Sequence, residues 1–262
     1  MYGRKPKGTV AYMGGIPAVY EPFCWAWGQL IQYNEEFLCN DKEYIHYYRA
    51  TFSDHAPARN SIVKSSLGDW LFMLDTDHIF EPDILHRLLR SMEELDLDVI
   101  TGIYQFKKHP FSPVIYKWDD DNEEQDEKEV VKLVEKILPN QEEKEKLSRP
   151  KKDITNFPQP IAQWDKSVKL MRIGSTGAGC LLVKQRVFDR IKIELNEEPF
   201  SRIKSFSEDH SFFYRLKQLD IKVFCDIRVQ CKHVILKEID LEEDYDEDNV
   251  DKAELKPVDC YA

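Results

Sequence analysis

Over its first hundred residues the chain alternates between short apolar runs and longer segments with helical spacing. The apolar runs have the length of strands and occupy residues 9–13, 44–52, 70–74 and 99–104. Helical spacing is found at 23–33, from residue 55, and after Glu81-Pro82-Asp83, where Pro and capping residues favour a helix start. Strands that alternate with helices form parallel sheets flanked by those helices. The sequence therefore predicts an α/β fold with a mostly parallel central sheet.

The second half of the chain resumes this pattern after a charged interruption. Residues 168–173 and 180–183 are apolar, with the glycine-rich segment "GSTGAG" between them. Helical spacing returns at 185–191 and in "SEDHSFFYRLKQLD", whose Ser and acidic residues favour a helix start. Residues 221–233 alternate, which predicts that Val223 and His233 share the inward face of a last strand.

One domain is expected over residues 1–237, with a charged insertion at about 119–163 and an acidic tail at 238–262. The net charge of -11 argues against broad binding to nucleic-acid backbones. No apolar run reaches the ~18–20 residues of a transmembrane segment, and the N-terminus lacks the apolar stretch of a signal peptide. The six cysteines form no dense framework, which is typical of reduced thiols. A cytoplasmic protein is expected.

The segment "LDTDHIFEPD" places two carboxylates and an imidazole where the third predicted strand ends. Ligands of such sheets bind beyond the carboxyl ends of the strands, so Asp75, Asp77 and His78 occupy a favoured position. Hard divalent cations prefer carboxylates, with an occasional imidazole. His78 can add a contact to a metal or phosphate, although a surface histidine beside a helix is the favoured interpretation. The Asp-x-Asp spacing alone is weak, because it recurs at Asp96/Asp98 and in the charged segments.

Four segments, in this order, resemble the core of GT-A glycosyltransferases of the family 2 kind. They are "HAPARNSIVKSSLGDWLFMLDTDHIFEPDIL" (55–85), "GSTGAGCLLVKQRVFDRI" (174–191), "SEDHSFFYRLKQLDIKVF" (207–224) and "VQCKHV" (229–234). In that family an Ala-Arg-Asn helix precedes a strand ending in a DxD motif. A glycine-rich segment, a Glu-Asp motif and a late strand with a histidine follow. The resemblance implies the GT-A fold, the Rossmann-like fold of nucleotide-diphospho-sugar transferases. Gly15-Ile16-Pro17 also resembles glycosyltransferase-like proteins of bacteriophages, which would place the protein in a host cytoplasm.

The resemblance implies a metal-dependent transfer of a sugar from a nucleotide sugar to an acceptor hydroxyl. Mn²⁺ or Mg²⁺ would be held by Asp75, Asp77 and His233, with Asp77 as a direct ligand and Asp75 at the ribose or the metal's water shell. A UDP-sugar is the favoured donor. A GDP-sugar stays the other candidate, because no clear aspartate that could contact uracil follows the second strand, unless Asp54 does so. The acceptor stays open between a glycan, a protein, a small molecule and a modified DNA base.

Further donor contacts carry over from the same motifs. Arg59 would lie near the diphosphate or the nucleobase, where its fork of donors suits phosphate. Asn60 either contacts the donor or caps its helix. Ile16 and Pro17 would line the nucleobase side, and Gly179 would let the backbone approach the donor sugar.

Asp209 is the candidate general base. In an inverting transfer, a carboxylate takes the proton of the acceptor hydroxyl as its oxygen attacks the anomeric carbon. His210 competes for this role, since an imidazole can also act as a base. The Glu208-Asp209 pair at a helix start also suits plain capping.

Other interpretations of the same residues stay open. Asp75 and Asp77 can be a solvated strand end, and His233 a core histidine. A nucleotidyltransferase of related fold would need a basic phosphate loop after the first strand, and "GGIP" has no Lys or Arg. A noncatalytic nucleotide-sugar-binding protein would keep the fold without the chemistry. A zinc site from Cys225, Cys231 and His233 is disfavoured, because the spacing matches no standard zinc finger.

Overall fold

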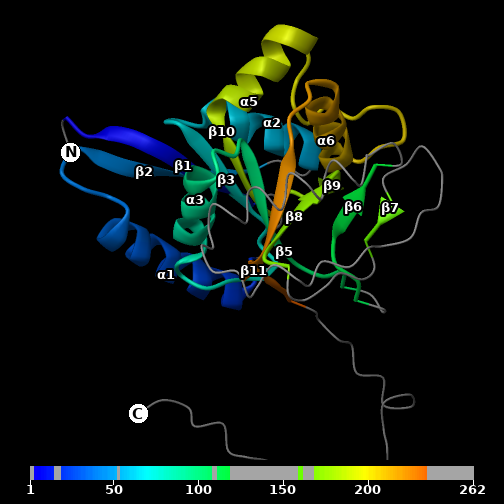
Figure 1. Ribbon diagram of the computed structural model, residues 1–262. Helices are drawn as coiled ribbons and strands as arrows, with labels where there is room; N and C mark the ends of the chain where they lie inside the picture. The colour runs from blue at the N-terminus through cyan, green and yellow to red at the C-terminus, as the bar shows by residue number, and fades with distance from the viewer. Residues whose placement is uncertain are drawn as a thin grey trace, which may run out of the picture.

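The computed structural model describes residues 3–14, 19–51, 54–107, 111–118, 159–161 and 168–234 (Figure 1). Ile16 and Pro17, nearly all of the charged insertion and the acidic tail lie outside these ranges. What the sequence predicts for them therefore stays a prediction. Within the described ranges, no helix combines the length and apolar composition that crossing a membrane requires.

Seven strands form the central sheet. In spatial order they are β2 (Glu43–Ala50), β1 (Lys5–Met13), β3 (Trp70–Leu74), β10 (Cys180–Lys184), β5 (Val99–Ile103), β11 (Val223–Gln230) and β8 (Leu170–Ile173). β1 pairs in parallel with β2 and β3, and β5 pairs in parallel with β11. β10 is antiparallel to β3 and β5, and β8 is antiparallel to β11. Five strands therefore run in one direction, which confirms the predicted mostly parallel sheet.

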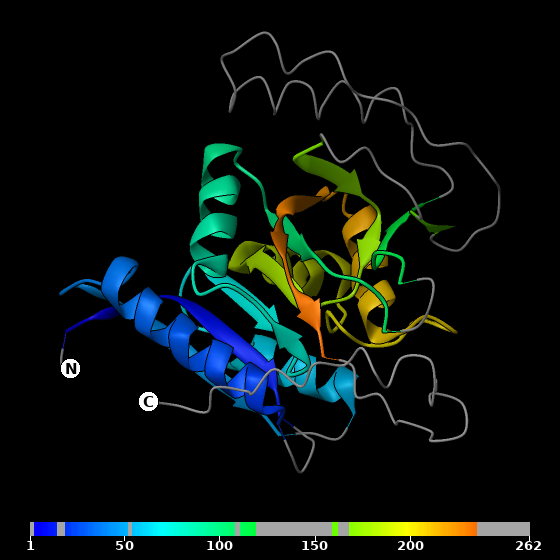
Figure 2. The same cartoon turned by 90° about the horizontal axis from the view of Figure 1, so that it is seen from below.

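Helices cover both faces of the sheet. Side chains of α1 (Glu21–Phe37) and α3 (Ile84–Glu94) pack on one face. Those of α2 (His55–Ser65), α5 (Gln185–Arg190) and α6 (Glu208–Gln218), which lie above the sheet in Figure 1, pack on the other. Figure 2, seen from below, shows α1 running across the near face with α3 beside it. A short π-helical turn, η2 (Ile191–Leu195), continues α5. The chain thus folds into three layers, as the alternation of strands and helices predicts.

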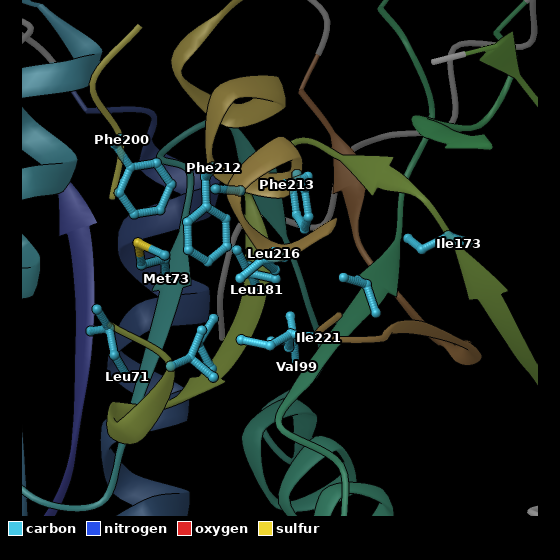
Figure 3. Close-up of a cluster of buried hydrophobic side chains, with 14 of the residues drawn as sticks. Leu71, Met73, Val99, Ile173, Leu181, Phe200, Phe212, Phe213, Leu216 and Ile221 are labelled. Atoms are coloured by element: carbon cyan, nitrogen blue, oxygen red, sulfur yellow. The ribbon is translucent and has the colours of Figure 1, made fainter. Parts of the chain in front are cut away.

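The side chains of β3 divide the core into two clusters. Leu71 and Met73 pack toward α2 and α6, whereas Phe72 and Leu74 pack toward α1 and α3. Every residue of β3 is buried, because a strand covered on both faces has no solvated side. Figure 3 shows the first cluster, in which strand side chains meet those of α6: Leu71, Met73, Val99, Leu181, Phe212, Phe213 and Leu216.

Two small sheets flank the central one. β12 (Lys232–His233) pairs antiparallel with β4 (His78–Ile79), so that His233 lies opposite His78. β6 (Ile115–Lys117) pairs with β7 (Gln159–Pro160) and with β9 (Ser175–Thr176). The first of these sheets joins the end of the last long strand to the segment that follows β3.

The regular alternation predicted for residues 221–233 is wrong, because the pairing of β11 with β5 changes register between Asp226 and Gln230. Val223 and Val229 consequently pack on opposite sides of the sheet. A shift of one position exchanges the inward and outward side chains of a strand. His233 therefore reaches its position through the pairing of β12 with β4, not through a continuous inward face.

Candidate functional site

Asp75, Tyr104 and Gly179 meet at one edge of the central sheet. β3 and β5 run in the same direction and end at this edge, whereas the reversed strand β10 begins there. The Asp75 N–H donates to the Gly179 carbonyl over 3.0 Å. The Gly179 N–H donates to the Tyr104 hydroxyl over 3.4 Å. The edge is the one where ligands of α/β sheets bind.

Asp77, His78 and His233 bring one carboxylate and two imidazoles together. One ligand atom of each lies within 4.8 Å of the others. Lys107 forms an ion pair with Asp77 Oδ2. Among the described residues, Asp77 Oδ1 and His78 Nε2 are buried without a hydrogen-bond partner, although buried polar atoms are normally satisfied. The open atoms and the oxygen and nitrogen donor set fit a divalent cation.

The structure corrects the expectation that His78 is a surface histidine. The residue is 0% exposed, and its ring packs against the rings of Tyr104 and His233, with centroids 4.5 and 4.4 Å away. Burial lowers the pKa of His78, against the raising effect of Asp75, and so favours the neutral imidazole. The two-residue pairing of β4 with β12, which no local pattern predicts, covers this side chain.

Arg59 lies at the centre of a second cluster, which contains three carboxylates. Its Nε atom is 3.0 Å from Asp209 Oδ1 and 3.6 Å from Glu208 Oε1. Its Nη2 atom is 3.5 Å from Asp75 Oδ1, and Nη1 donates to the Ala178 carbonyl over 3.3 Å. The fork of donors that the resemblance assigns to the nucleotide is thus engaged by side chains of this chain. Donor contact by Arg59 stays a prediction.

Glu208 and Asp209 are neighbours at the start of α6, yet their pKa values move in opposite directions. Burial favours the protonated form of Glu208, but His55 at 3.4 Å and Arg59 outweigh burial and lower the pKa to about 2. Burial is also the largest influence on Asp209, and Glu208 and Asp75 add to it. Together they raise the pKa of Asp209 to about 6 despite Arg59. The Asp209 side chain keeps 18% of its surface exposed, so a reactant can reach it.

His210 is turned toward Ser175 and Tyr116. Its Nδ1 atom lies 2.6 Å from the Ser175 hydroxyl, and its ring meets that of Tyr116 edge-on with centroids 4.8 Å apart. Burial lowers the pKa of His210. The backbone N–H of His210 also donates to Ser207 Oγ over 3.2 Å, which confirms the predicted cap at the start of α6.

Asn60 joins two segments of the scaffold. It lies inside α2 and therefore does not cap this helix, whose N-cap is Asp54. Its side-chain oxygen accepts a hydrogen bond from the Phe200 N–H over 2.9 Å. Asp54, the alternative candidate for uracil, forms an exposed ion pair with Arg202 at 2.9 Å. Donor contacts by these two residues stay predictions.

Gly177 and Gly179 leave room for side chains of the site. A Cβ at Gly179 would lie 2.5 Å from His78 Cε1 and 2.7 Å from Asp75 Oδ2. A Cβ at Gly177 would lie 2.2 Å from the Tyr104 hydroxyl. These distances are far below van der Waals contact, so a side chain at either position would have to displace side chains of the site. The predicted approach of this backbone to a donor sugar stays a prediction.

Asp96 and Asp98 show what the same spacing does elsewhere. Lys184 lies 3.1 Å from Asp96 and Arg186 lies 2.5 Å from Asp98. Asp96 is 87% exposed and adopts a positive φ of 50° in the turn before β5. Asp96 and Asp98 therefore form surface ion pairs just before β5 and are not part of the site.

The zinc site considered from the sequence is not formed. Cys225 packs in the cluster on the α6 side of the sheet, whereas Cys231 packs in the cluster on the α1 side. The register shift in β11 separates the two thiols. They therefore cannot bind one ion together with His233.

Sequence patterns did not indicate Tyr104, Lys107 or His55 as members of the site. Tyr104 ends the predicted strand at 99–104 and Lys107 follows it, so the rule that draws attention to Asp75 could have found them. His55 precedes Arg59 by one helical turn and shares its face of α2, a spacing that the sequence displays. The sequence places Glu208 in the Glu-Asp motif and at a helix start, but it does not predict the partners of Glu208, because His55 and Arg59 come from a distant segment.

Comparison with known proteins supports one family. Residues 31–126 match the model described as glycosyl transferase family 2, and this range includes α2, β3 and the Asp75–His78 segment. The match supports a family 2-like glycosyltransferase. It spans a little over a third of the chain, and Asp209, His210 and His233 lie beyond it. No curated protein matches the chain significantly. Together with the seven-stranded sheet and its flanking helices, the match confirms the predicted GT-A type of α/β fold.

Proposed function

We propose that this protein is a metal-dependent glycosyltransferase that moves a sugar from a nucleotide-sugar donor to an acceptor hydroxyl, with inversion at the anomeric carbon. One observation carries the proposal. The Asp75–Asp77 segment of the matched range lies at the same sheet edge as His233 and as Asp209, although these residues are far apart in the sequence. A UDP-sugar is the favoured donor and a GDP-sugar the second candidate.

Asp77 and His233 hold the divalent cation in this proposal, with Asp75 at the ribose or the metal's water shell. The open Asp77 Oδ1 atom, 3.9 Å from His233 Nε2, supports this assignment. When bound, Mn²⁺ or Mg²⁺ neutralises charge on the diphosphate leaving group. Asp77 and His233 thereby fix where the diphosphate lies relative to Asp209.

Asp209 acts as the general base. The acceptor oxygen forms a bond to the anomeric carbon, the bond from that carbon to the diphosphate oxygen breaks, and the acceptor proton moves to Asp209. A carboxyl group with a pKa of about 6 is ionised at neutral pH and still basic enough to take a proton. Arg59 holds this carboxylate at 3.0 Å and fixes its direction. His210 is the less favoured base, because Ser175 engages its Nδ1 atom.

The remaining assignments rest on the sequence. Ile16 and Pro17 line the nucleobase side, and Asn60, Arg59 and Gly179 lie near the donor. The acceptor is a glycan, a protein, a small molecule or a modified DNA base. The resemblance to bacteriophage proteins adds the host cytoplasm as the place of action.

The test is slow donor hydrolysis with Mn²⁺, measured on the full chain after a thermal-shift screen of nucleotide sugars has found the donor. A tight donor raises the melting temperature by mass action. We expect Asp209→Asn to lower turnover about 10²–10⁴-fold while it keeps the donor-induced shift. We expect Asp77→Ala to lose the metal dependence of donor binding.

Asp96→Asn is the matched control, since it removes a carboxylate of the same spacing outside the site. It should leave hydrolysis and donor binding unchanged. If Asp209→Asn and Asp77→Ala behave like Asp96→Asn, the chain does not catalyse this reaction. Retained donor binding with no hydrolysis by the wild type would instead identify a noncatalytic nucleotide-sugar-binding protein.

A further inference from the structure

Two buried polar atoms lie beside each other without a partner. Within the described part of the chain, few buried side-chain atoms lack a hydrogen bond, and Asp77 Oδ1 and His78 Nε2 are both among them. Arg59 Nε and Asp209 Oδ1 are also among them, but these two atoms face each other as an ion pair at 3.0 Å. No ion pair that short joins Asp77 Oδ1 or His78 Nε2 to the described part of the chain, so these two atoms call for a ligand. His233 completes the group, because its ligand atom lies within 4.8 Å of the other two.

Hydrogen bonds fix both imidazoles in the form that binds a cation. His78 Nδ1 lies 2.9 Å from the Gly179 carbonyl. A carbonyl oxygen only accepts, so Nδ1 carries the proton and Nε2 keeps a free lone pair. His233 Nδ1 contacts the Gln105 carbonyl in the same way, which leaves its Nε2 directed at Asp77 Oδ1. Histidines that bind metals characteristically donate their other N–H to a backbone carbonyl or carboxylate.

Asp75 has a different environment. Its Oδ1 atom lies 3.5 Å from Arg59, whose guanidinium already balances the charges of Asp75, Glu208 and Asp209. Asp77 differs in its neighbours: Lys107 contacts Oδ2, and Oδ1 is buried without a hydrogen bond in a group with the two imidazoles that does not include Asp75. The carboxylate available to a cation is therefore that of Asp77.

We infer that the cation is held by Asp77 Oδ1 and by the Nε2 atoms of His78 and His233, with Asp75 outside the ligand set. This inference rests on the proposed function, whose metal it assigns to a ligand set with two imidazoles. The second imidazole has a consequence for the choice of metal. Nitrogen ligands favour transition metals, and affinity rises from Mn²⁺ to Co²⁺, whereas Mg²⁺ prefers oxygen ligands. The site therefore selects Co²⁺ and Mn²⁺ over Mg²⁺.

The test is calorimetric titration of the full chain with Co²⁺, Mn²⁺ or Mg²⁺ alone, without nucleotide. The variant is His78→Asn, because the Asn amide can still donate to the Gly179 carbonyl but offers nothing in place of Nε2. His46→Asn on β2 is the matched control outside the site. Asp75→Asn tests the carboxylate that the inference leaves out of the ligand set.

We expect the wild type to bind one Co²⁺ more tightly than Mg²⁺. His78→Asn should weaken Co²⁺ binding about 10–100-fold, whereas His46→Asn and Asp75→Asn should stay within a factor of about three, a shift of about 0.7 kcal/mol or less. Unchanged Co²⁺ binding by His78→Asn, with a loss in Asp77→Asn, would overturn the inference and leave the proposed function standing. Tighter Mg²⁺ than Co²⁺ binding by the wild type would overturn it as well.

A spectroscopic measurement on the wild type removes the dependence on the folding of His78→Asn. Pulsed electron paramagnetic resonance of the Mn²⁺-loaded protein counts coordinated imidazole nitrogens. Two imidazoles support the inference, and one overturns it. If no metal binds the wild type with or without UDP, the metal dependence of the proposed function fails together with the inference.

Discussion

Asp75 and Asp77 are separated by one residue, yet they belong to clusters of opposite kind. Asp75 joins Glu208 and Asp209 around Arg59, so the chain itself supplies the positive charge. Asp77 joins the imidazoles of His78 and His233, and its open oxygen has no hydrogen-bond partner among the described residues. The Arg59 cluster therefore takes its positive charge from a buried guanidinium of the chain, whereas in the histidine cluster the open oxygen of Asp77 lies 3.9 Å from His233 Nε2. One intervening residue is thus enough to give two carboxylates of the same segment different surroundings.

Removal of Arg59 should have the largest effect on stability. Arg59→Met leaves three carboxylates near one another without their buried counter-charge, and breaking a buried ion pair on one side costs about 3–5 kcal/mol. Urea unfolding at neutral pH would measure this loss. Arg202→Met is the control, because its ion pair with Asp54 is exposed and worth about 1 kcal/mol or less. Equal losses in both variants would mean that Arg59 does not stabilise the cluster of Asp75, Glu208 and Asp209.

Gly179 lies against both clusters, so a methyl group there should disturb them together. Its Cβ would lie 2.5 Å from His78 Cε1 and 2.7 Å from Asp75 Oδ2, and such overpacking costs about 1–3 kcal/mol. We expect Gly179→Ala to lower the free energy of unfolding and to weaken metal binding. Gly28→Ala in α1 has open space around its Cβ and should instead stabilise the helix by about 0.5–1 kcal/mol. Unimpaired metal binding in Gly179→Ala would show that the clusters are not coupled there.

In the metal-free protein, a substitution in the histidine cluster should change the free energy of unfolding much less than one in the Arg59 cluster. Asp77→Asn keeps the shape of a side chain whose Oδ1 atom is unpartnered, so the metal-free protein should change by about 1 kcal/mol or less. With Mn²⁺ at a hundred times its dissociation constant, the wild type gains about 2.7 kcal/mol and the variant does not. Thermal unfolding with and without Mn²⁺ measures both quantities. A large loss in the metal-free variant would contradict the difference between the clusters.

The smallest expected effect concerns pH. Asp209 must be ionised to accept a proton, so turnover should fall about tenfold per pH unit below its pKa of about 6. Glu208 raises the pKa of Asp209, so Glu208→Gln should move this acidic limb to lower pH. The profile of kcat against pH measures both. A limb that moves to higher pH in Glu208→Gln would contradict the electrostatic coupling of these neighbours.

Much of the fold follows from local patterns. The runs at 70–74 and 99–104 became β3 and β5 with small changes of boundary, whereas β1 begins at Lys5, four residues before the run at 9–13. Strands covered on both faces have continuous apolar sequences, and amphipathic helices have apolar residues at helical spacing. Local residues therefore suffice to predict both. The reversed strand β10, which comes between β3 and β5, was not predictable, because strand order depends on pairing between distant segments.

For the site, the sequence by itself determined that carboxylates and an imidazole follow a buried strand, and that a Glu-Asp pair begins a late helix. Only the tertiary structure decided that Asp75 faces Arg59 while Asp77 faces the histidines. It also decided that His78 is buried. His233 lies at the site because β12 pairs with β4 after the register shift in β11. The physical reason is the same in each case. Chemical type and local periodicity belong to neighbouring residues, whereas burial, ion pairing and ligand geometry depend on contacts that form between segments far apart in the chain.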